Sequence, residues 1–464
     1  MSQPNILIFM TDQQRGDSVT DPRCLTPNLD TFRQLGVTFT NAFCPSPHCC
    51  PSRATFFTGL YPSQHGVWHN VNVTNAISRG LNEGIRTWSE DLAEAGYAMS
   101  FSGKWHVSAT MGADQYGWDV RNNRGQFIAT PERRWNSYRE MDTTPHERQP
   151  GEITRPGWGE YIHYGERENP FGDGNVIDEA IDIIKTRTDQ SHPWCQYVGP
   201  LGPHDPYFVP QEFLEMYDLA DIDLPENFSD DLDQRPNLYK RTRDIFAQLT
   251  PDEHREAIRH YLAFCTYEDY LFGRVLNALK EAGQLDNTIT IYTSDHGDYC
   301  GEHRLWCKGL PCFQGAYRIP LVIGGDRITN PGRTCDAFIS LADFAPTFLE
   351  FAQLDINRQM YGRSLVPFLE DRKVEDWRDI VYTQSNGNEQ YGIQRSVMTS
   401  AWKYVHNGFD FDELYDLTND PGETRNLIND SRHQDKVSAL CKRMWQLGAE
   451  TSDNCINPYI MVGF

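Results

Sequence analysis

Side chains that could perform chemistry follow four short segments of the sequence. The segments are Asn5–Thr11, 97–102, Trp194–Gly199 and Thr288–Ser294, and each has the continuous pattern of a strand buried on both faces. The residues that follow them are Asp12 and Gln13, Lys104 and His106, His204 and Asp205, and Asp295 and His296. Because ligands bind beyond the carboxyl ends of parallel strands, we expect these side chains to form one site.

The residue types at these strand ends indicate a metal ion beside an anionic substrate. The residues after the first and fourth segments supply mainly oxygen donors, which suit Ca²⁺ or Mg²⁺, and the imidazole of His296 leaves Mn²⁺ open. Lys104 and His106 are two residues apart and would point the same way on an extended chain. Lys308 follows the fourth segment by a loop. Cations around a metal ion predict an anionic substrate that is held from several sides.

The elements that must position these residues predict an α/β fold. A fifth segment of the same kind spans 319–324, and helix-period segments separate the strands. The longest helix starts at a capping box, Thr250-Pro251-Asp252-Glu253, and is expected to end at Gly283. Strands alternating with helices predict a large, mostly parallel central sheet sandwiched by helices.

Two regions depart from this alternation. Residues 127–175 are rich in Arg, aromatic residues, Gly and Pro, which predicts an irregular but ordered insertion with a functional role. After about residue 370, the segments 379–384 and 402–406 are expected to be strands of a small antiparallel sheet. We therefore expect an N-terminal catalytic domain over 1–370, and a C-terminal α+β subdomain over 371–464 that ends in a helix.

Composition and charge exclude some classes of partner. The chain has 464 residues and a formal net charge of −23, which argues against nucleic acid as a ligand. The apolar run at residues 6–10 is too short for a signal peptide or a membrane span, so we expect a cytoplasmic protein without a membrane partner. In a reducing compartment, most of the 12 cysteines should be free and buried.

Cys49 and Cys50 stand out among the cysteines because of their neighbours. Pro51 lies near the start of a predicted helix, so both thiols would lie at the positive end of the helix dipole, close to Arg53. Such surroundings lower the pKa of a thiol and favour a nucleophile or a metal ligand. A buried cysteine that only caps the helix fits the same local features.

The run Cys49-Cys50-Pro51-Ser52-Arg53, followed by Phe57, Thr58 and Gly59, resembles the signature of the type I, formylglycine-dependent sulfatases of the alkaline-phosphatase-like superfamily. In that family the first cysteine, here Cys49, is oxidised to formylglycine (3-oxoalanine). The resemblance covers most of the chain in the family's order, except for residues 127–175. It implies the family's α/β fold with a small C-terminal subdomain. Gly315 stands where many relatives have a glutamate-glycine pair.

The resemblance also implies a role for each residue at the strand ends. One divalent metal, Ca²⁺ in most relatives and Mn²⁺ as the alternative here, would be held by Asp12, Gln13, Cys49, Asp295 and His296. Arg53 and His106 would orient and activate the formylglycine hydrate, which attacks sulfur with one hydroxyl and expels sulfate with the other. Lys104 and Lys308 would neutralise the sulfate oxygens. His204 would protonate the departing alcohol.

We therefore expect a sulfatase that acts on a small sulfated carbohydrate, because the aromatic and Arg-rich insertion suits stacking on sugars. Candidate substrate contacts are His69, Trp105, Arg121, Arg124 and Trp158. The expected partner is a formylglycine-generating enzyme or an anaerobic sulfatase-maturating enzyme. Three alternatives stay open: an arylsulfatase, a phosphonate monoester or phosphodiester hydrolase of the same superfamily, and a non-catalytic protein that binds sulfated glycans.

Overall fold

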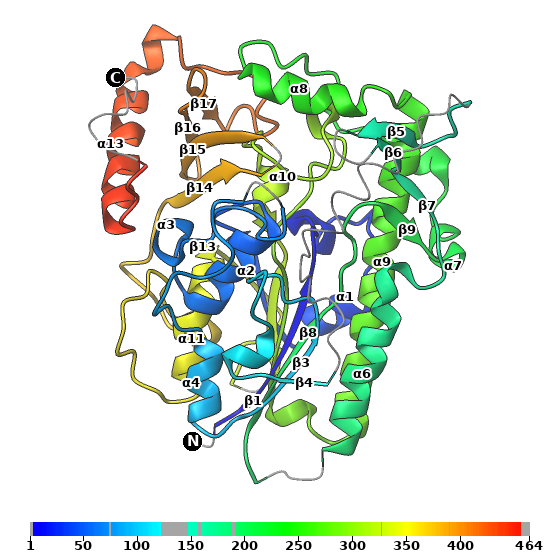
Figure 1. Ribbon diagram of the computed structural model, residues 1–464, viewed down its shortest axis with the longest axis vertical. Coiled ribbons are helices and arrows are strands. Elements are labelled where there is room, and N and C mark those ends of the chain that lie inside the picture. Colours follow the sequence, from blue (N-terminus) through cyan, green and yellow to red (C-terminus); the bar gives the residue numbers. More distant parts are fainter. Residues whose placement is uncertain are drawn as a thin grey trace.

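The computed structural model describes residues 3–73, 76–121, 147–155, 159–187, 191–325, 327–388 and 390–455. A nine-stranded sheet forms its centre (Figure 1). Across the sheet the strands are β11 (Arg318–Ile319), β2 (Gly36–Phe43), β12 (Leu321–Gly325), β10 (Thr288–Ser294), β1 (Asn5–Thr11), β8 (Trp194–Gly199), β3 (Ala98–Gly103) and β4 (Asp119–Val120), and β13 (Arg333–Ser340) also pairs with β2. From β10 to β4 all pairs are parallel, as the sequence predicts for an α/β fold.

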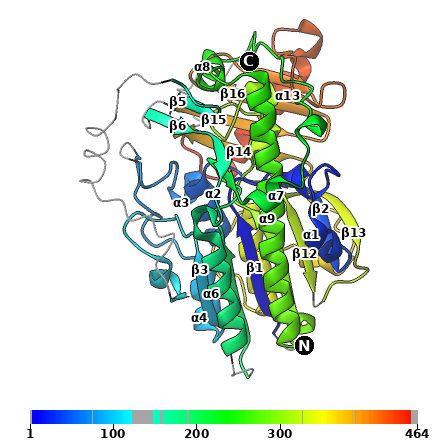
Figure 2. The ribbon, with the colours of Figure 1, turned by 90° about the vertical axis from the view of Figure 1, so that its right-hand side faces the viewer.

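Helices cover both faces of this sheet, and β1 shows why its sequence requires that. Ile6, Ile8 and Met10 pack in one cluster with residues of α2 (Cys49–Thr58), α4 (Trp88–Glu94) and α11 (Phe344–Phe351). Leu7 and Phe9 pack on the other face against α6 (Asp173–Thr186) and α9 (Pro251–Glu281). Successive side chains of a strand point to opposite faces, so a continuously apolar strand needs two covers. Figure 2 shows α6 and α9 side by side over one face, with α1 (Pro27–Arg33) beside them.

The start of the longest helix, α9, is built as the sequence predicts. The Thr250 hydroxyl accepts a hydrogen bond from the Glu253 backbone N–H at 3.3 Å, and the Glu253 carboxylate accepts one from the Thr250 N–H at 2.8 Å. Pro251 occupies the first turn, where its missing N–H costs nothing. Gly283, with φ +64°, follows the end of the helix. This helix positions Tyr261, whose hydroxyl contacts the backbone of the segment that follows β1.

The expected strand at 319–324 is two strands in the structure, and the second is antiparallel to its neighbours. Pro320 separates β11 from β12 because it has no N–H for the ladder. β12 then runs antiparallel to both β10 and β2. The strands β2 and β13, which the pattern of apolar segments did not predict, extend this edge of the sheet.

A second sheet lies beside the first, in the region where the sequence pattern changes. It contains β14 (Val381–Gly387), β15 (Tyr391–Met398), β16 (Trp402–Asn407) and β17 (Glu413–Asp416), all antiparallel. The helix α13 (Gln434–Glu450) packs against β15 and β16 (Figure 1). We propose that this unit, over 371–464, is a separate C-terminal subdomain.

Part of the expected insertion is ordered into short strands. Residues 127–146 and 156–158 lie outside the described residues. Within the rest of 127–175, β5 (Glu152–Arg155) and β6 (Gly159–Ile162) form an antiparallel pair, and β7 (Tyr164–Glu166) pairs with β9 (Tyr207–Val209). The other α-helices of the described residues are α3 (Pro62–His65), α7 (Gln211–Leu214), α8 (Asn237–Phe246), α10 (Gln314–Tyr317) and α12 (Val366–Leu369).

The cysteines agree with the expectation that most of them are free and buried. All twelve cysteines have free thiols, and ten of them are buried. Within the described ranges, the structure contains no helix that is both long enough and apolar enough to cross a lipid bilayer.

A buried pair of carboxyl groups beneath the site predicts how stability depends on pH. Glu268 of α9 is fully buried beside Asp173, and burial together with that neighbour raises the pKa of Glu268 well above its usual range. Unfolding exposes Glu268, so above pH 5 the unfolded chain loses a proton that the folded chain keeps. Stability should therefore fall as pH rises, by about 1.4 kcal/mol per pH unit for this one proton.

Glu268→Gln should remove that contribution, because the amide is neutral in both states. We expect the melting temperature of the variant, relative to wild type, to rise steadily between pH 5.5 and pH 8. Glu281→Gln, a substitution of an exposed side chain on the same helix, is the matched control and should show no such trend. A difference between wild type and Glu268→Gln that is constant across this pH range would contradict the assignment.

Candidate active site

The register of two central strands brings the first carboxylates of the site together. Thr11 at the end of β1 pairs with Ser294 at the end of β10, so Asp12 and Asp295 leave the sheet side by side. The Asp12 N–H donates to the Gly202 carbonyl at 3.0 Å, which ties the loop after β8 to the same place. Both carboxylates are fully buried. The ends of β1, β8 and β10 therefore lie close together, as the sequence predicts.

Helix α2 presents Cys49 and Arg53 to these carboxylates. Cys49 is the first residue of the helix, and its Sγ lies 3.2 Å from His296 Nε2 and 3.8 Å from Asp12 Oδ1. Arg53, one turn later, donates from Nη2 to Asp12 Oδ2 at 3.0 Å and from Nε to Asp295 Oδ2 at 2.8 Å. A guanidinium with its fixed fork can bridge two carboxylates in this way, which holds both on one side.

The atoms that remain fit a divalent metal ion. One ligand atom from each of Asp12, Cys49, Asp295 and His296 lies within 4.8 Å of the others. Each carboxylate uses Oδ2 for Arg53, and each Oδ1 lies 3.7 Å from His296 Nε2. His296 Nδ1 lies 2.9 Å from the Gly297 carbonyl, which can only accept, so Nδ1 carries the proton and Nε2 presents its lone pair. Two carboxylate oxygens and a neutral imidazole nitrogen are a suitable donor set for Ca²⁺ or Mn²⁺.

Gln13 lies at the edge of this cluster and not fully within it. Its amide nitrogen donates to Asp298 Oδ2 at 2.6 Å and to Asp205 Oδ1 at 3.2 Å, and its amide oxygen accepts from Lys308. The backbone of Gln13 has φ +66°, which turns the side chain away from the direction of β1. Its oxygen is thus shared with a lysine, in contrast to the oxygens of Asp12 and Asp295 that face His296.

Two lysines supply the positive charge that the sequence predicts for an anion site. Lys104 binds Asp12 Oδ2, and Lys308 lies 2.6 Å from His204 Nε2. Burial opposes the charge of both lysines, but nearby negative charges outweigh it. Asp12 and Cys49 hold the pKa of Lys104 above its usual value, and Cys49 and Asp205 do the same for Lys308. Burial alone would raise the pKa of the Cys49 thiol, yet the charges of Lys104 and Lys308 hold that pKa well below its usual range.

The two histidines expected to move protons are held in defined orientations. His204 Nδ1 lies 2.6 Å from the backbone carbonyl of Asp205 and therefore carries a proton, which leaves Nε2 facing Lys308. His106 Nε2 lies 3.0 Å from Asn72 Oδ1. Burial lowers the pKa of His106 to about 4, so this imidazole is neutral near pH 7.

The five expected substrate contacts have very different surroundings. Trp105 is 1% exposed and packs in the core against Phe57, where its indole donates to the Met111 carbonyl. His69 is fully buried, with its ring 4.8 Å from that of Tyr391. Arg121 lies at the surface in an ion pair with Asp182 at 2.9 Å. Arg124 and Trp158 lie outside the described residues.

The structure adds residues to the site that the sequence analysis did not assign. Asp205 and Asp298 both bind the Gln13 amide, and Asn72 binds His106. Asp205 had a visible signal, since it directly follows His204 at a strand end. Asp298, three residues after Asp295, had a weaker signal of the same kind. Asn72 had none, because it lies in an irregular segment after α3.

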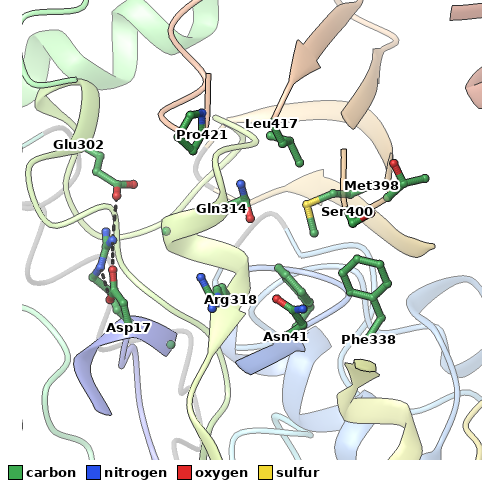
Figure 3. Close-up of a pocket in the computed structure, with 15 residues that line it drawn as sticks. Asp17, Asn41, Glu302, Gln314, Arg318, Phe338, Met398, Ser400, Leu417 and Pro421 are labelled. Atoms are coloured by element: carbon green, nitrogen blue, oxygen red, sulfur yellow. Dashed lines mark hydrogen bonds and ion pairs between the residues drawn. The ribbon is translucent and has the colours of Figure 1, made fainter. Parts of the chain in front are cut away.

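Arg15 braces the two loops that carry the carboxylates. Its guanidinium donates to the carbonyls of Asp298 and Tyr299 at 3.0 and 2.9 Å, and it pairs with Asp17 and Glu302. A cavity of about 350 Å³ lies beside this brace, between the large sheet and the C-terminal sheet (Figure 3). None of the candidate catalytic or metal-binding residues lines it. A Cβ at Gly315 would lie 2.6 Å from Glu302 Oε2 and 2.7 Å from an Arg15 nitrogen, so a glycine lets the brace form.

Comparisons with known proteins cover nearly the whole chain. The sequence model of the sulfatase family matches residues 4–354, and that of the C-terminal part of N-sulphoglucosamine sulphohydrolase matches residues 301–450. An arylsulfatase of Clostridium perfringens is 30% identical in an alignment of length 464, which covers 95% of this chain and 93% of the relative. An N-acetylglucosamine-6-O-sulfatase of Bacteroides thetaiotaomicron is 25% identical over 527 residues, covering 97% and 87%.

A solved structure shows the same fold. The phosphonate monoester hydrolase of Silicibacter pomeroyi superposes with a TM-score of 0.80 at 22% identity, over 97% of this chain and 96% of that one. At this identity the likeness concerns the fold. The family match, by contrast, spans both carboxylate loops, helix α2 and the strand ends that carry the lysines and histidines. With that coverage and this cluster of groups, the chain belongs to the sulfatase family and is a sulfuric ester hydrolase.

Proposed function

We propose that this enzyme hydrolyses the sulfate ester of a small anionic carbohydrate, with a nucleophile made from Cys49 by oxidation to formylglycine. The observation that carries the proposal is the position of Cys49 Sγ, at the start of α2 and 3.2 Å from His296 Nε2, within the group of possible metal ligands. A core cysteine needs no such neighbours. The N-acetylglucosamine-6-O-sulfatase relative supports a sugar as the alcohol, and the arylsulfatase relative supports the aryl alternative.

Each side chain has a distinct part in this proposal. The hydrate of the aldehyde supplies one hydroxyl to attack sulfur and a second to expel sulfate, which a thiolate cannot do. Asp12, Asp295 and His296 would hold a metal ion, with Gln13 at its edge, and the ion would supply Lewis acidity to the sulfate oxygens. Arg53 fixes both carboxylates, and the neutral His106 is placed to accept a proton from the hydrate.

The two lysines would bind the sulfate group itself. Lys104 and Lys308 reach the site from the loops after β3 and β10 and lie near Cys49 from different directions. Their buried ammonium groups are fixed before substrate arrives, so they stabilise charge on sulfate oxygens without reorganising.

Removal of His204 should affect substrates according to their leaving group. His204→Ala should lower kcat for a sugar sulfate by roughly 10²–10⁴-fold, because an alkoxide leaves poorly without a proton. For a sulfate of an acidic phenol, such as 4-nitrophenyl sulfate, the loss should stay below about tenfold. Steady-state kinetics on both substrates test this prediction. Equal losses on the two would exclude His204 as the general acid.

The modification of Cys49 can be tested without any activity. Conversion of the thiol to an aldehyde lowers the mass of the peptide that contains residue 49 by about 18 Da before hydration. Protein isolated from its native host should show this shift, which would also establish that a formylglycine-generating or anaerobic maturating enzyme acts on it. An unshifted peptide would favour the alternative of a sulfated-glycan-binding protein without catalysis.

A second candidate function is the hydrolysis of phosphonate monoesters or phosphodiesters. The observation that favours it is the Gln13 and His296 pair at the metal site, which replaces the more usual Asp and Asn of sulfatases. Ser52, in a motif without an inserted glycine, follows the sulfatase form and counts against it. Matured enzyme should be assayed with matched sulfate and phosphate esters. Faster turnover of the phosphodiester would overturn the sulfate proposal.

The identity of the metal and the location of the enzyme complete the proposal. Ca²⁺ is our first choice, and the His296 nitrogen makes Mn²⁺ the alternative. Calorimetric titration of chelator-treated protein with each ion decides between them. Twelve free thiols suit a reducing compartment, and we propose the cytoplasm, which fractionation of the host would test.

A further inference from the structure

We infer that Asp205 is the positioning residue for His204 and Lys308, and that the hairpin of β5 and β6 serves to hold Asp205 in place. The inference rests on the acid role of His204 in the proposed function. It assigns to this hairpin, which belongs to the expected insertion at residues 127–175, a role other than contact with substrate.

One oxygen of Asp205 is bound by the hairpin. Arg155, at the end of β5, lies 2.7 Å from Asp205 Oδ2, and the Tyr161 hydroxyl of β6 donates to the same oxygen at 2.5 Å. The Arg155 guanidinium also lies over the Tyr161 ring, with 5.1 Å between its central carbon and the ring centroid. Asp205 is 5% exposed. Two donors on one buried oxygen fix the rotation of the carboxylate.

The other oxygen is thereby directed at the active site. Asp205 Oδ1 lies 3.2 Å from the Gln13 amide nitrogen, 3.3 Å from His204 Nδ1 and 4.0 Å from Lys308 Nζ. These three side chains come from the loops that follow β1, β8 and β10. One carboxylate oxygen thus faces groups from three separate strands.

The Asp205 carboxylate positions His204, the proposed general acid, next to Lys308. The carboxylate lies beside Nδ1, the ring nitrogen that faces away from Lys308, and together with the backbone carbonyl of Asp205 it orients the ring. Lys308 Nζ lies 2.6 Å from the other ring nitrogen. A buried carboxylate within 4.0 Å of both the lysine ammonium and the ring holds the two side chains in this arrangement. Without the Asp205 carboxylate, the ring of His204 should lose this orientation, and it would be placed less well to give a proton to a poor leaving group.

Asp205→Asn tests the inference because it removes the charge and nearly keeps the shape. We expect kcat on a poor leaving group to fall by about 10²-fold, with less than about fivefold loss on an activated aryl ester. Asp298→Asn is the matched control. Asp298 is a second buried acid on the Gln13 amide, and its other hydrogen bonds are to Tyr207 and the backbone of Cys300 and Cys307. Its substitution should lower both rates by the same factor.

A second variant covers the case in which Asp205→Asn does not fold. Tyr161→Phe deletes one hydroxyl on Asp205 Oδ2 and keeps the carboxylate, so it should show the same selectivity in weaker form, about three- to tenfold on the poor leaving group. Equal losses on both leaving groups in the variants of Asp205 and Tyr161 would show a structural anchor only and overturn the inference.

A readout that needs no turnover separates this inference from the proposed function. In ¹⁵N NMR spectra, the signals of the His204 ring should move in Asp205→Asn and should keep their wild-type positions in Asp298→Asn. An unchanged His204 signal would overturn the inference. The kinetic comparison can use whichever ester class the wild type hydrolyses, so activity on phosphate esters instead of sulfate esters would refute the proposed function and leave this test intact.

Discussion

Replacement of Cys49 by alanine should abolish turnover, with a fall in kcat of at least about 10⁴-fold. The reason is that alanine cannot be oxidised to an aldehyde, so no group at this position can attack sulfur and then release sulfate. Lys104, Lys308 and Arg53 would stay in place and could still bind the anion. The melting temperature should change little, because only one small buried atom is lost. Steady-state kinetics with a sulfate ester and a thermal melt measure both effects.

The neighbouring thiol provides the control for this experiment. Cys50 is equally buried, but its Sγ accepts a hydrogen bond from the Val71 N–H at 3.3 Å and plays no part in our proposal. Cys50→Ser keeps an acceptor there and should retain activity within a few-fold. If Cys49→Ala kept more than a tenth of the wild-type rate, or if the two substitutions had equal effects, Cys49 would not be the source of the nucleophile.

Asp295→Asn should produce the second large effect, on both metal affinity and rate. Asp295 presents Oδ1 to His296 and binds Arg53 through Oδ2, so its charge serves two purposes. Burial and the nearby Asp12 raise the pKa of Asp295, which means that the ionised carboxylate is destabilised unless a further positive charge lies close to it. We expect metal affinity to weaken by roughly 100-fold and kcat to fall by about 10³-fold.

Titration calorimetry with Ca²⁺ and Mn²⁺ measures the loss of affinity without reference to activity. Asp269→Asn is the matched control, since Asp269 is also a buried carboxylate but binds the start of helix α1 through Asn28 and Leu29. It should lower thermal stability and leave metal affinity unchanged. Equal metal affinities in wild type and Asp295→Asn would remove Asp295 from the ligand set.

Much of the candidate site was visible in the sequence because its residues follow strands directly. The strands at residues 5–11, 194–199 and 288–294 have the bounds that their apolar runs predict. Parallel strands in register place the residues that follow them at one edge of the sheet, so the pairing of the two strands is enough to bring Asp12 and Asp295 together. The helix that begins at Cys49 was likewise predictable, since Pro51 and Gly59 mark its two ends.

Contacts between distant segments were not visible in the same way. The single strand expected at 319–324 is interrupted at Pro320, and both of its parts run antiparallel to β2, a partner that is distant in the sequence. Trp105, expected to contact substrate, packs in the core beside Phe57, because a tryptophan next to two site residues gives no sign of which way its ring turns. Side-chain direction after a strand depends on backbone angles such as φ +66° at Gln13.

By itself, the sequence determined the kind of chemistry and the order of its parts, because residue types and their distance from a strand end are local properties. Only the tertiary structure decided how those parts share their atoms. Arg53 binds one oxygen of each carboxylate and leaves the other facing His296, and Asp205 divides its two oxygens between a hairpin and the active site. Such division follows from distances and angles between segments that meet only in the folded chain.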